Sequence, residues 1–369
     1  MSTRGTIRLA TRGSDLARRQ TASVRDRLSA RRLDVETVEV STRGDEIRDE
    51  LIHRLGKTGA FVRALDEQVL DGDVDAAVHS MKDMPTESPP ELVVAGVPER
   101  APAGDVLVTP DGAELDDLPE GAVVGTSSLR RGAQLRRARP DLQVEPLRGN
   151  VDTRLEKLLA PGLQREHQRR MDAEDEDEGE HPDNFDQPVE EWFDGLTELE
   201  RQAMERAVET EYDAIVLAEA GLRRSGLLDS VETTRLPKDA FVPAPGQGAI
   251  AVTARGDAEA TETIRNLVDD PVTRVETTVE RTILAELGGG CIAPIGVYAV
   301  VQGEYVHVAV QVLSLDGTEA IERTADLPIT DHADAAADLA ADLRAEGAAE
   351  LIDRAREEAD EDEGEEADA

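Results

Sequence analysis

Short apolar runs alternate with segments of helical periodicity through the first two thirds of the sequence, and this alternation restricts the fold more than any other feature. The strand-like runs occupy 6–11, 35–40, 75–80, 105–110, 122–128 and 142–147, and the helical segments 15–30, 59–72, 129–140 and 150–160. A further strand-helix pair occupies 212–226. Such alternation predicts parallel α/β layers, in which helices cover the faces of a sheet.

The pattern changes after residue 270. Residues 296–329 have the composition of several antiparallel strands joined by Gly and Asp-Gly turns, and a long Ala-rich helix is predicted over 331–356. We therefore expect a smaller α+β domain over 270–356. The acidic end of the chain, 357–369, is expected to be a disordered tail.

The Pro- and Gly-rich stretch 241–252 is typical of a chain that crosses between domains. We expect a first α/β domain built from 1–99 with 250–268, and a second built from 100–249. Gln247, within the crossing stretch, could face a cleft between them.

An acidic insertion over 161–210 interrupts the second domain. Its carboxylates cannot form a core, so we expect a surface element that ends in an amphipathic helix over 196–210. His167 and His181 lie beside carboxylates and could bind a metal, but their spacing is poor for ligands, and a solvated insertion is favoured. A lid over the functional site is the alternative.

The composition limits the partners and the compartment. Asp and Glu number 80 against 41 Lys and Arg, which gives a net charge of -39 at pH 7 and disfavours binding to nucleic acid or anionic lipid. Arginine takes the place of lysine at nearly all basic positions, and we expect a halophilic protein. A single cysteine excludes an internal disulfide. Because no apolar run resembles a membrane span or an export signal, the expected compartment is the cytoplasm.

Basic and hydroxyl side chains gather at four strand-to-helix junctions. They are Thr11, Arg12 and Ser14; Thr126, Ser127, Ser128, Arg130 and Arg131; Arg148, Asn150 and Arg154; and Arg223 and Arg224. The carboxyl ends of strands bind ligands in open α/β sheets, helix N-termini offer free N–H groups, and arginine binds carboxylates or phosphates at two points. The sequence therefore predicts a ligand with several negative groups. The alternative is that the serines cap helices and the arginines form salt bridges.

The strand over 75–80 leads into His79-Ser-Met-Lys-Asp-Met-Pro85. Lys82 and Asp83 are adjacent at its open end, where a carboxylate could stabilise a developing cation and transfer protons. An ordinary surface pair is the alternative for these two residues. For His79 we favour a core histidine over a catalytic base.

Cys291, the single cysteine, follows Gly288, Gly289 and Gly290. A small buried apolar role is the common one for cysteine, but a glycine-rich loop can bring a thiol close to a ligand. No histidine lies near it in the sequence to activate the thiol, which weakens a cysteine-protease interpretation.

The order of these motifs resembles a known family. The stretches "TRGSDLARRQ", "DAAVHSMKDMP", "GTSSLRRGAQL", "LRGNVDTRL", "PAPGQGAI" and "GGGCIAPIG" are similar to those of porphobilinogen deaminase (hydroxymethylbilane synthase) of the haloarchaeal type. The resemblance implies two type II periplasmic-binding-protein-like α/β domains around a cleft, plus a small C-terminal α+β domain. It also implies a transferase of tetrapyrrole (haem, sirohaem or cobalamin) biosynthesis. Such an enzyme condenses four porphobilinogen molecules head to tail into linear hydroxymethylbilane and releases ammonia.

The resemblance assigns roles to the residues that match its motifs. Cys291 would hold a dipyrromethane cofactor through a thioether, and Asp83 would be the catalytic carboxylate. Further cofactor contacts are expected from Lys82, Thr126, Ser127, Ser128, Arg130 and Arg131. Substrate contacts are expected from Arg12, Ser14, Phe61, Arg148, Arg154, Arg224 and Gln247. No metal is implied, and the family suggests a monomer whose product could pass to uroporphyrinogen-III synthase.

Two features depart from the family's pattern. "GKTGAF" at 56–61 replaces a more glycine-rich run, which leaves the roles of Lys57 and Thr58 open, and the insertion is not typical. Three other hypotheses remain. A non-enzymatic anion-binding protein would bind its ligand reversibly, and a cysteine-nucleophile acyltransferase would react with thiol reagents. An inactive paralogue is disfavoured because Asp83 and Cys291 are both present.

Overall fold

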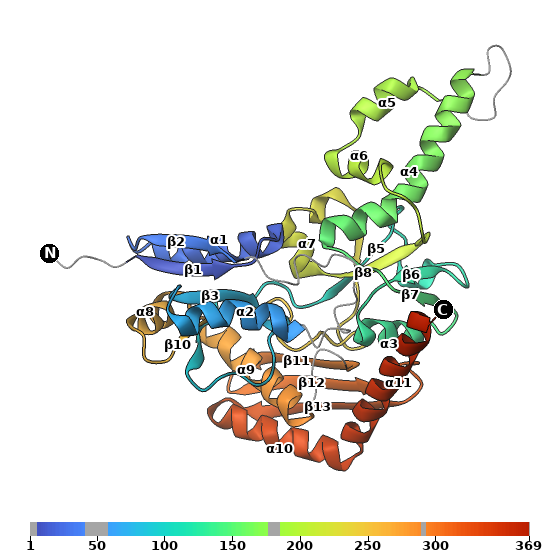
Figure 1. The fold of residues 1–369 in the computed structure, drawn as a ribbon. Coiled ribbons are helices and arrows are strands. Elements are labelled where there is room, and N and C mark those ends of the chain that lie inside the picture. Colours follow the sequence, from blue (N-terminus) through green and yellow to red (C-terminus); the bar gives the residue numbers. More distant parts are fainter. Residues whose placement is uncertain (1–5, 41–57, 176–184, 289–292, 369) are drawn as a thin grey trace.

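The computed structural model describes residues 6–40, 58–175, 185–288 and 293–368, and within them the strands form three sheets (Figure 1). The first sheet has the order β2-β1-β3-β10-β4. Its strands are β1 (Ile7–Thr11), β2 (Val35–Glu39), β3 (Ala76–Ser80), β4 (Leu92–Gly96) and β10 (Ile250–Arg255). Helices α1 (Asp15–Ser29), α2 (Thr58–Asp71) and α8 (Glu259–Val268) pack against it.

The second sheet repeats this layout in the order β7-β6-β8-β5-β9. Its strands are β5 (Asp105–Val108), β6 (Val123–Gly125), β7 (Gln143–Glu145), β8 (Ala214–Ala218) and β9 (Thr233–Arg235), and its helices include α3 (Leu129–Ala138) and α7 (Glu219–Ser225). The two α/β sheets therefore share one strand order.

The two α/β sheets are mixed, whereas the sequence predicted parallel layers. β1 pairs in parallel with β2 and β3, but β10 runs antiparallel to both of its neighbours. In the second sheet β5 occupies the equivalent position and runs antiparallel to its neighbours β8 and β9. The reason is the path of the chain, because β10 and β5 each enter a sheet directly from the other one.

Two crossing segments connect these sheets. The first, 97–104, leads from β4 to β5, and the second, 236–249, leads from β9 back to β10. They contact each other where the amide of Ala101 donates to the carbonyl of Gly248 at 3.1 Å. Gly248 has a φ of +83° and a side chain there would collide with that backbone, so only glycine allows this approach.

The third sheet is antiparallel, as the sequence predicted. It consists of β11 (Ile295–Gln302), β12 (Tyr305–Leu313) and β13 (Ala320–Pro328), and it packs against α9 (Pro271–Glu286) and α10 (His332–Ala345). The long predicted helix is divided at Gly347, whose φ of +99° ends α10. The chain then continues as α11 (Ala348–Asp368), so the helix covers most of the tail that was expected to be disordered.

The insertion forms a helical arm that extends away from the three sheets (Figure 1). It comprises the second half of α4 (Val151–Asp175), α5 (Val189–Gly195) and α6 (Glu198–Met204). The sequence predicted that the first helix ends at 160, but α4 continues through Pro161. Proline removes one helical hydrogen bond, yet α6 packs along α4, and the side chain of Gln164 donates to the carbonyl of Arg206 at 2.8 Å. The helix predicted over 196–210 ends early, at Met204.

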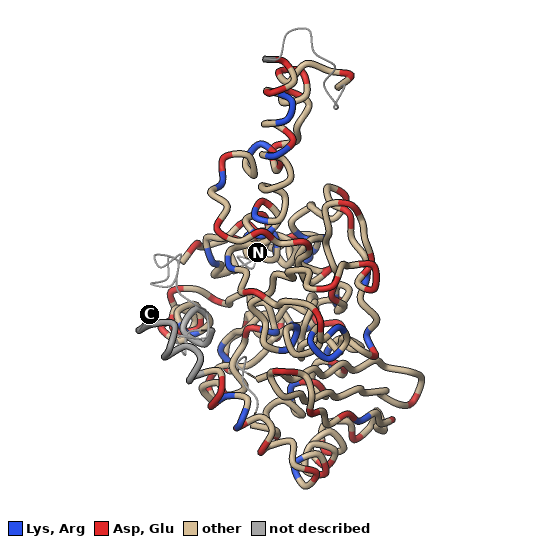
Figure 2. Tube along the Cα trace, turned by 90° about the vertical axis from the view of Figure 1, so that its right-hand side faces the viewer, with Lys and Arg blue, Asp and Glu red and all other residues tan. Residues whose placement is uncertain are grey.

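Each sheet has its own aliphatic core, and Phe241 and Tyr212 are the aromatic residues buried among the described ones. Carboxylates lie along the whole trace, the arm included (Figure 2). Within the described ranges, every helix is too short or too polar to span a lipid bilayer.

Candidate active site

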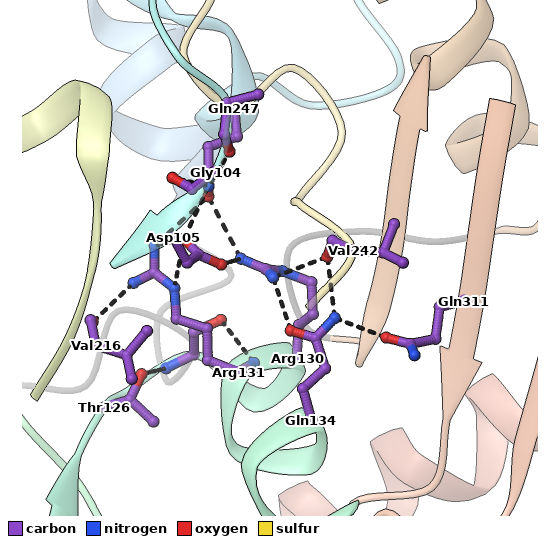
Figure 3. A network of polar contacts seen from close by, with 12 residues as sticks. Gly104, Asp105, Thr126, Arg130, Arg131, Gln134, Val216, Val242, Gln247 and Gln311 are labelled. Atoms are coloured by element: carbon purple, nitrogen blue, oxygen red, sulfur yellow. Dashed lines mark hydrogen bonds and ion pairs between the residues drawn. The ribbon is translucent and has the colours of Figure 1, made fainter. Parts of the chain in front are cut away.

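The polar centre of the molecule lies where β5 begins, directly after the first crossing segment. Asp105 is almost fully buried between two guanidinium groups (Figure 3). Its Oδ2 accepts from Nη2 of Arg130 at 2.8 Å, and its Oδ1 accepts from Nη2 and Nε of Arg131 at 2.8 and 3.1 Å. Both arginines come from the first turn of α3 and are themselves buried.

Gln247 joins this group from the second crossing segment. Its Nε2 donates to the Ala103 carbonyl at 2.5 Å and to Oδ1 of Asp105 at 2.8 Å, and its Oε1 accepts from both arginines. The sequence placed Gln247 facing a cleft, whereas its side chain is 1% exposed and lies between the two crossing segments. The arginine pair is therefore attached to both crossings.

The electrostatics of this centre keep Asp105 ionised. Burial alone would raise the pKa of Asp105, but the charges and hydrogen bonds of Arg130 and Arg131 outweigh burial and hold it well below its usual range. The reverse holds for Arg130, whose pKa is lowered chiefly by burial, against the attraction of Asp105.

Lys82 and Asp83 occupy a single turn at the end of β3, where the amide of Met81 donates to the Ala249 carbonyl at 3.1 Å. Arg281 of α9 donates to the carbonyl of Pro85 at 2.6 Å and so fixes the end of this turn. Asp83 raises the pKa of Lys82, but burial and the positive charges of two arginines outweigh it, and the net effect is a lowered pKa.

Those two arginines are Arg131 and Arg154, the latter on the first turns of α4. Burial and the charge of Arg131 lower the pKa of Arg154 to about 10, and Asp83 opposes this shift. Four cations and two carboxylates therefore interact electrostatically here. The carboxylates are Asp83 and Asp105, and the cations are Lys82, Arg130, Arg131 and Arg154. Positive charge is in excess here, in a chain whose net charge is -39.

The predicted hydroxyl residues bond to the backbone. Ser14 caps α1 by accepting from the amide of Ala17 at 3.3 Å, and Ser128 caps α3 by accepting from the amide of Arg131 at 3.5 Å. Ser127 donates to the Leu147 carbonyl at 2.6 Å. Thr126 accepts from the amide of Ser128 at 3.3 Å.

The contacts of the other predicted arginines differ from those of the Asp105 pair. Arg224 on α7 donates to the Gly248 carbonyl at 2.7 Å, and burial lowers its pKa to about 10. Its neighbour Arg223 forms a salt bridge to Glu219, as the alternative interpretation held. Arg12 and Arg148 are half-buried.

Three further predictions concern His79, Phe61 and Cys291. His79 is buried, as expected, and its Nε2 lies 2.9 Å from Oδ1 of Asp66 and 3.0 Å from Oγ1 of Thr253. Phe61 falls within α2, but its side chain lies outside the described residues, as does all of Cys291. No group of three potential metal ligands occurs in the part of the chain that the structure describes.

Sequence reasoning missed Asp105 and the pair formed by Arg100 and Glu280. Asp105 opens an otherwise apolar strand, and a charge at that position of a buried run is the signal that could have indicated it. Arg100 and Glu280 carry no such signal, because they are 180 positions apart in the sequence.

The residues at this centre fit a ligand that carries several carboxylates. The charge of Arg131 lowers the pKa of Lys82, Arg130 and Arg154, so added negative charge would relieve this repulsion. Nε of Arg130 is a buried N–H without a hydrogen-bond partner. A dipyrromethane group, with acetate and propionate on each ring, has the carboxylates that such donors require.

Comparisons with known proteins point to one family. Residues 7–167 and 199–263 match the family described as porphobilinogen deaminase, dipyromethane cofactor binding domain, and residues 275–346 match the porphobilinogen deaminase C-terminal domain. A probable porphobilinogen deaminase of Halobacterium salinarum is 54% identical over 96% of this chain and 99% of its own length. A porphobilinogen deaminase of an Exiguobacterium species is 38% identical over 86% and 89%. A periplasmic substrate-binding protein of Coxiella burnetii is 14% identical over 73% and 94%, with a TM-score of 0.35.

Proposed function

The chain belongs to the porphobilinogen deaminase family, and from this premise we propose that it condenses four porphobilinogen molecules head to tail into linear hydroxymethylbilane. In each condensation the C–N bond of a porphobilinogen aminomethyl group breaks and ammonia leaves. The methylene carbon then bonds to a free ring carbon of the growing chain, which loses a proton. Release of the finished chain breaks its bond to the cofactor, and one water molecule supplies the terminal hydroxyl of the product and the proton that the cofactor regains.

The observation that supports this proposal is the excess of positive charge around Lys82, Arg131 and Arg154. Every pyrrole unit of the substrate carries two carboxylates, so the growing chain is a polyanion. Cations held close together before binding attract such a chain without further reorganisation, and the acidic exterior does not compete for it.

We assign the chemical step to Asp83. A carboxylate fixed beside Lys82 at the end of β3 can accept hydrogen bonds from pyrrole N–H groups, stabilise the cation that forms as ammonia leaves, and accept the ring proton. Arg154 would bind a carboxylate of the reacting ring. Arg12, Arg148 and Arg224, with Ser14 and Phe61, would bind more distant rings.

The dipyrromethane cofactor, held by a thioether to Cys291, would supply the free pyrrole end from which the chain is extended. Lys82 and Arg131 would orient its carboxylates, together with the helix start at Thr126, Ser127 and Ser128, where backbone N–H groups and a positive dipole end favour anions.

We further infer three domains, with 1–99 and 250–268 in the first, 100–249 in the second and 270–356 in the third. Each range contains the strands of one sheet. The single thiol and the acidic composition favour a halophilic, cytoplasmic enzyme. A monomer that transfers its product to uroporphyrinogen-III synthase completes the proposal.

Intact mass spectrometry tests this function. Wild-type protein purified in high salt should carry the added mass of two pyrrole units, and Cys291→Ala should not. Wild-type protein should also release ammonia from porphobilinogen, which the variant should fail to do. An unmodified wild-type mass after incubation with porphobilinogen would exclude the cofactor and leave reversible anion binding as the explanation of the site.

A further inference from the structure

The donors of the arginine pair are nearly all used within the protein. A guanidinium has five N–H bonds. Those of Arg130 go to Gln134, Val242, Asp105 and Gln247, which leaves the buried Nε. Those of Arg131 go to Asp105 through Nε and Nη2, to Gln247 and to the Val216 carbonyl, which leaves one N–H on Nη1. Each arginine therefore retains a single N–H.

Asp105 thus occupies the two-point face of Arg131 that a ligand carboxylate would otherwise take (Figure 3). Two neighbouring guanidiniums repel each other, and in a buried site they stay together only with an anion between them. Asp105 is that anion, and it is attached through Gln247 to the first crossing segment.

The two arginines face different neighbours. Arg131 contributes to the field at Lys82 and Arg154. Arg130 bonds to Gln134, which in turn donates to Gln311 of β12 at 2.7 Å. The carboxylate between them therefore connects the third sheet to the cation cluster.

We propose that Asp105 is a positioning residue for carboxylate recognition. It assembles the arginine pair before any ligand arrives and holds Arg131 beside Lys82 and Arg154, where the carboxylates of cofactor and substrate bind. This inference rests on the proposed function. Arg131 would then donate a single hydrogen bond to the ligand. It would attract the ligand's carboxylates mainly through its charge and its fixed position, and not through a two-point hydrogen-bonded pair.

The test compares Asp105→Asn with Asp141→Asn in the same high salt. Asp141 forms a two-point pair with Arg139 at the far end of α3, at 2.8 and 2.6 Å, and so is a matched control outside the site. Asp105→Asn should raise KM for porphobilinogen about tenfold or more, while kcat per cofactor-loaded chain stays within about threefold, since Asp83 is untouched. The fraction of chains with the two-pyrrole mass should fall. Asp141→Asn should match wild type in all three.

A second variant moves the charge instead of removing it. In Asp105→Asn/Gln247→Glu the carboxylate comes from position 247, whose Oε1 lies 3.3 and 3.5 Å from the two arginines. A glutamate there loses the donation of Nε2 to the Ala103 carbonyl, so KM and cofactor loading should recover in part, to values between those of Asp105→Asn and wild type. A merely structural role would restore the thermal midpoint without restoring KM.

The outcomes separate the two proposals. If wild type neither carries the adduct nor consumes porphobilinogen, the proposed function fails. If wild type does both and Asp105→Asn equals Asp141→Asn, the positioning role alone is overturned. Should Asp105→Asn not fold, a folded double variant that loads cofactor supports the role, and a folded double variant that stays unloaded refutes it.

Discussion

The guanidinium of Arg100 and the carboxylate of Glu280 meet at two points, with Nη1–Oε1 and Nη2–Oε2 distances of 2.8 and 3.0 Å. Glu280 lies fully buried on α9, and its carboxylate also accepts from the amides of Gly246 at 2.7 Å and Ala299 at 2.8 Å. Arg100 belongs to the first crossing segment, Gly246 to the second and Ala299 to β11. One carboxylate therefore joins both crossings to the third sheet.

Glu280→Gln should destabilise the protein by about 3 kcal/mol, because buried Arg100 would keep only the more distant carboxylate of Glu276, at 3.9 Å, and one of the two amides would lose its acceptor. Denaturant unfolding at constant high salt measures this. Glu286→Gln, on the same helix, removes an exposed partner of Arg344 at 3.7 Å and should cost less than about 1 kcal/mol. Equal effects of the two changes would show that the buried pair contributes no more than a surface pair.

Gly317→Ala should weaken the contact between the third sheet and α3. Gly317 lies in the turn between β12 and β13 with a φ of +74°, and an added Cβ would lie 2.5 Å from the Ala133 carbonyl oxygen and 2.8 Å from the Arg137 amide. The left-handed backbone costs about 1 kcal/mol for alanine, and the collision should add about 1–3 kcal/mol.

The matched control is Gly303→Ala, in the other turn of the same sheet. Gly303 has a φ of +64° and nothing within 4 Å of its added Cβ, so it measures the backbone term alone. Thermal unfolding of both variants should give a clearly larger loss for Gly317→Ala. A loss no larger than that of Gly303→Ala would mean that the turn moves freely away from α3.

Arg131→Met should raise the pKa of Lys82. In the wild type that pKa lies below its usual value, because burial and the charges of Arg131 and Arg154 outweigh the attraction of Asp83. Removal of one positive neighbour favours the protonated amine, so labelling of Lys82 by an amine reagent should require a higher pH. Peptide mass spectrometry across a pH series measures the profile for cofactor-free protein. The control variant Arg139→Met, at the far end of α3, should leave the pH profile of Lys82 labelling unchanged. A shift of the Arg131→Met profile to lower pH would contradict the conclusion that the charge of Arg131 lowers the pKa of Lys82.

Local patterns predicted much of the fold, since strands such as β1, β3 and β8 are apolar runs whose burial is apparent from composition. β9 was missed because its three residues, Thr-Thr-Arg, have no apolar periodicity. A proline read from the sequence alone predicts the end of a helix. α4 continues through Pro161 because it packs against α6, a contact that the local sequence does not indicate.

The candidate site likewise has residues that the sequence indicated and residues that it did not. Lys82, Asp83 and the arginines stand at the ends of recognisable strands, so the sequence alone indicated an anion site. The role of Gln247 could not be predicted from the sequence, because its contact with Asp105 joins residues 142 positions apart. That contact forms only when both crossing segments have folded. Nothing local in either residue indicates the other.

The position of β10 has a consequence for the order in which the protein is made. β10 lies between β3 and β4, yet it begins at Ile250, after every strand of the second sheet has been synthesised. The second sheet, by contrast, is complete at Arg235. During vectorial synthesis the middle of the chain can therefore fold before its beginning, and the first 96 residues wait, with a gap in their sheet, for a strand translated more than 150 codons later.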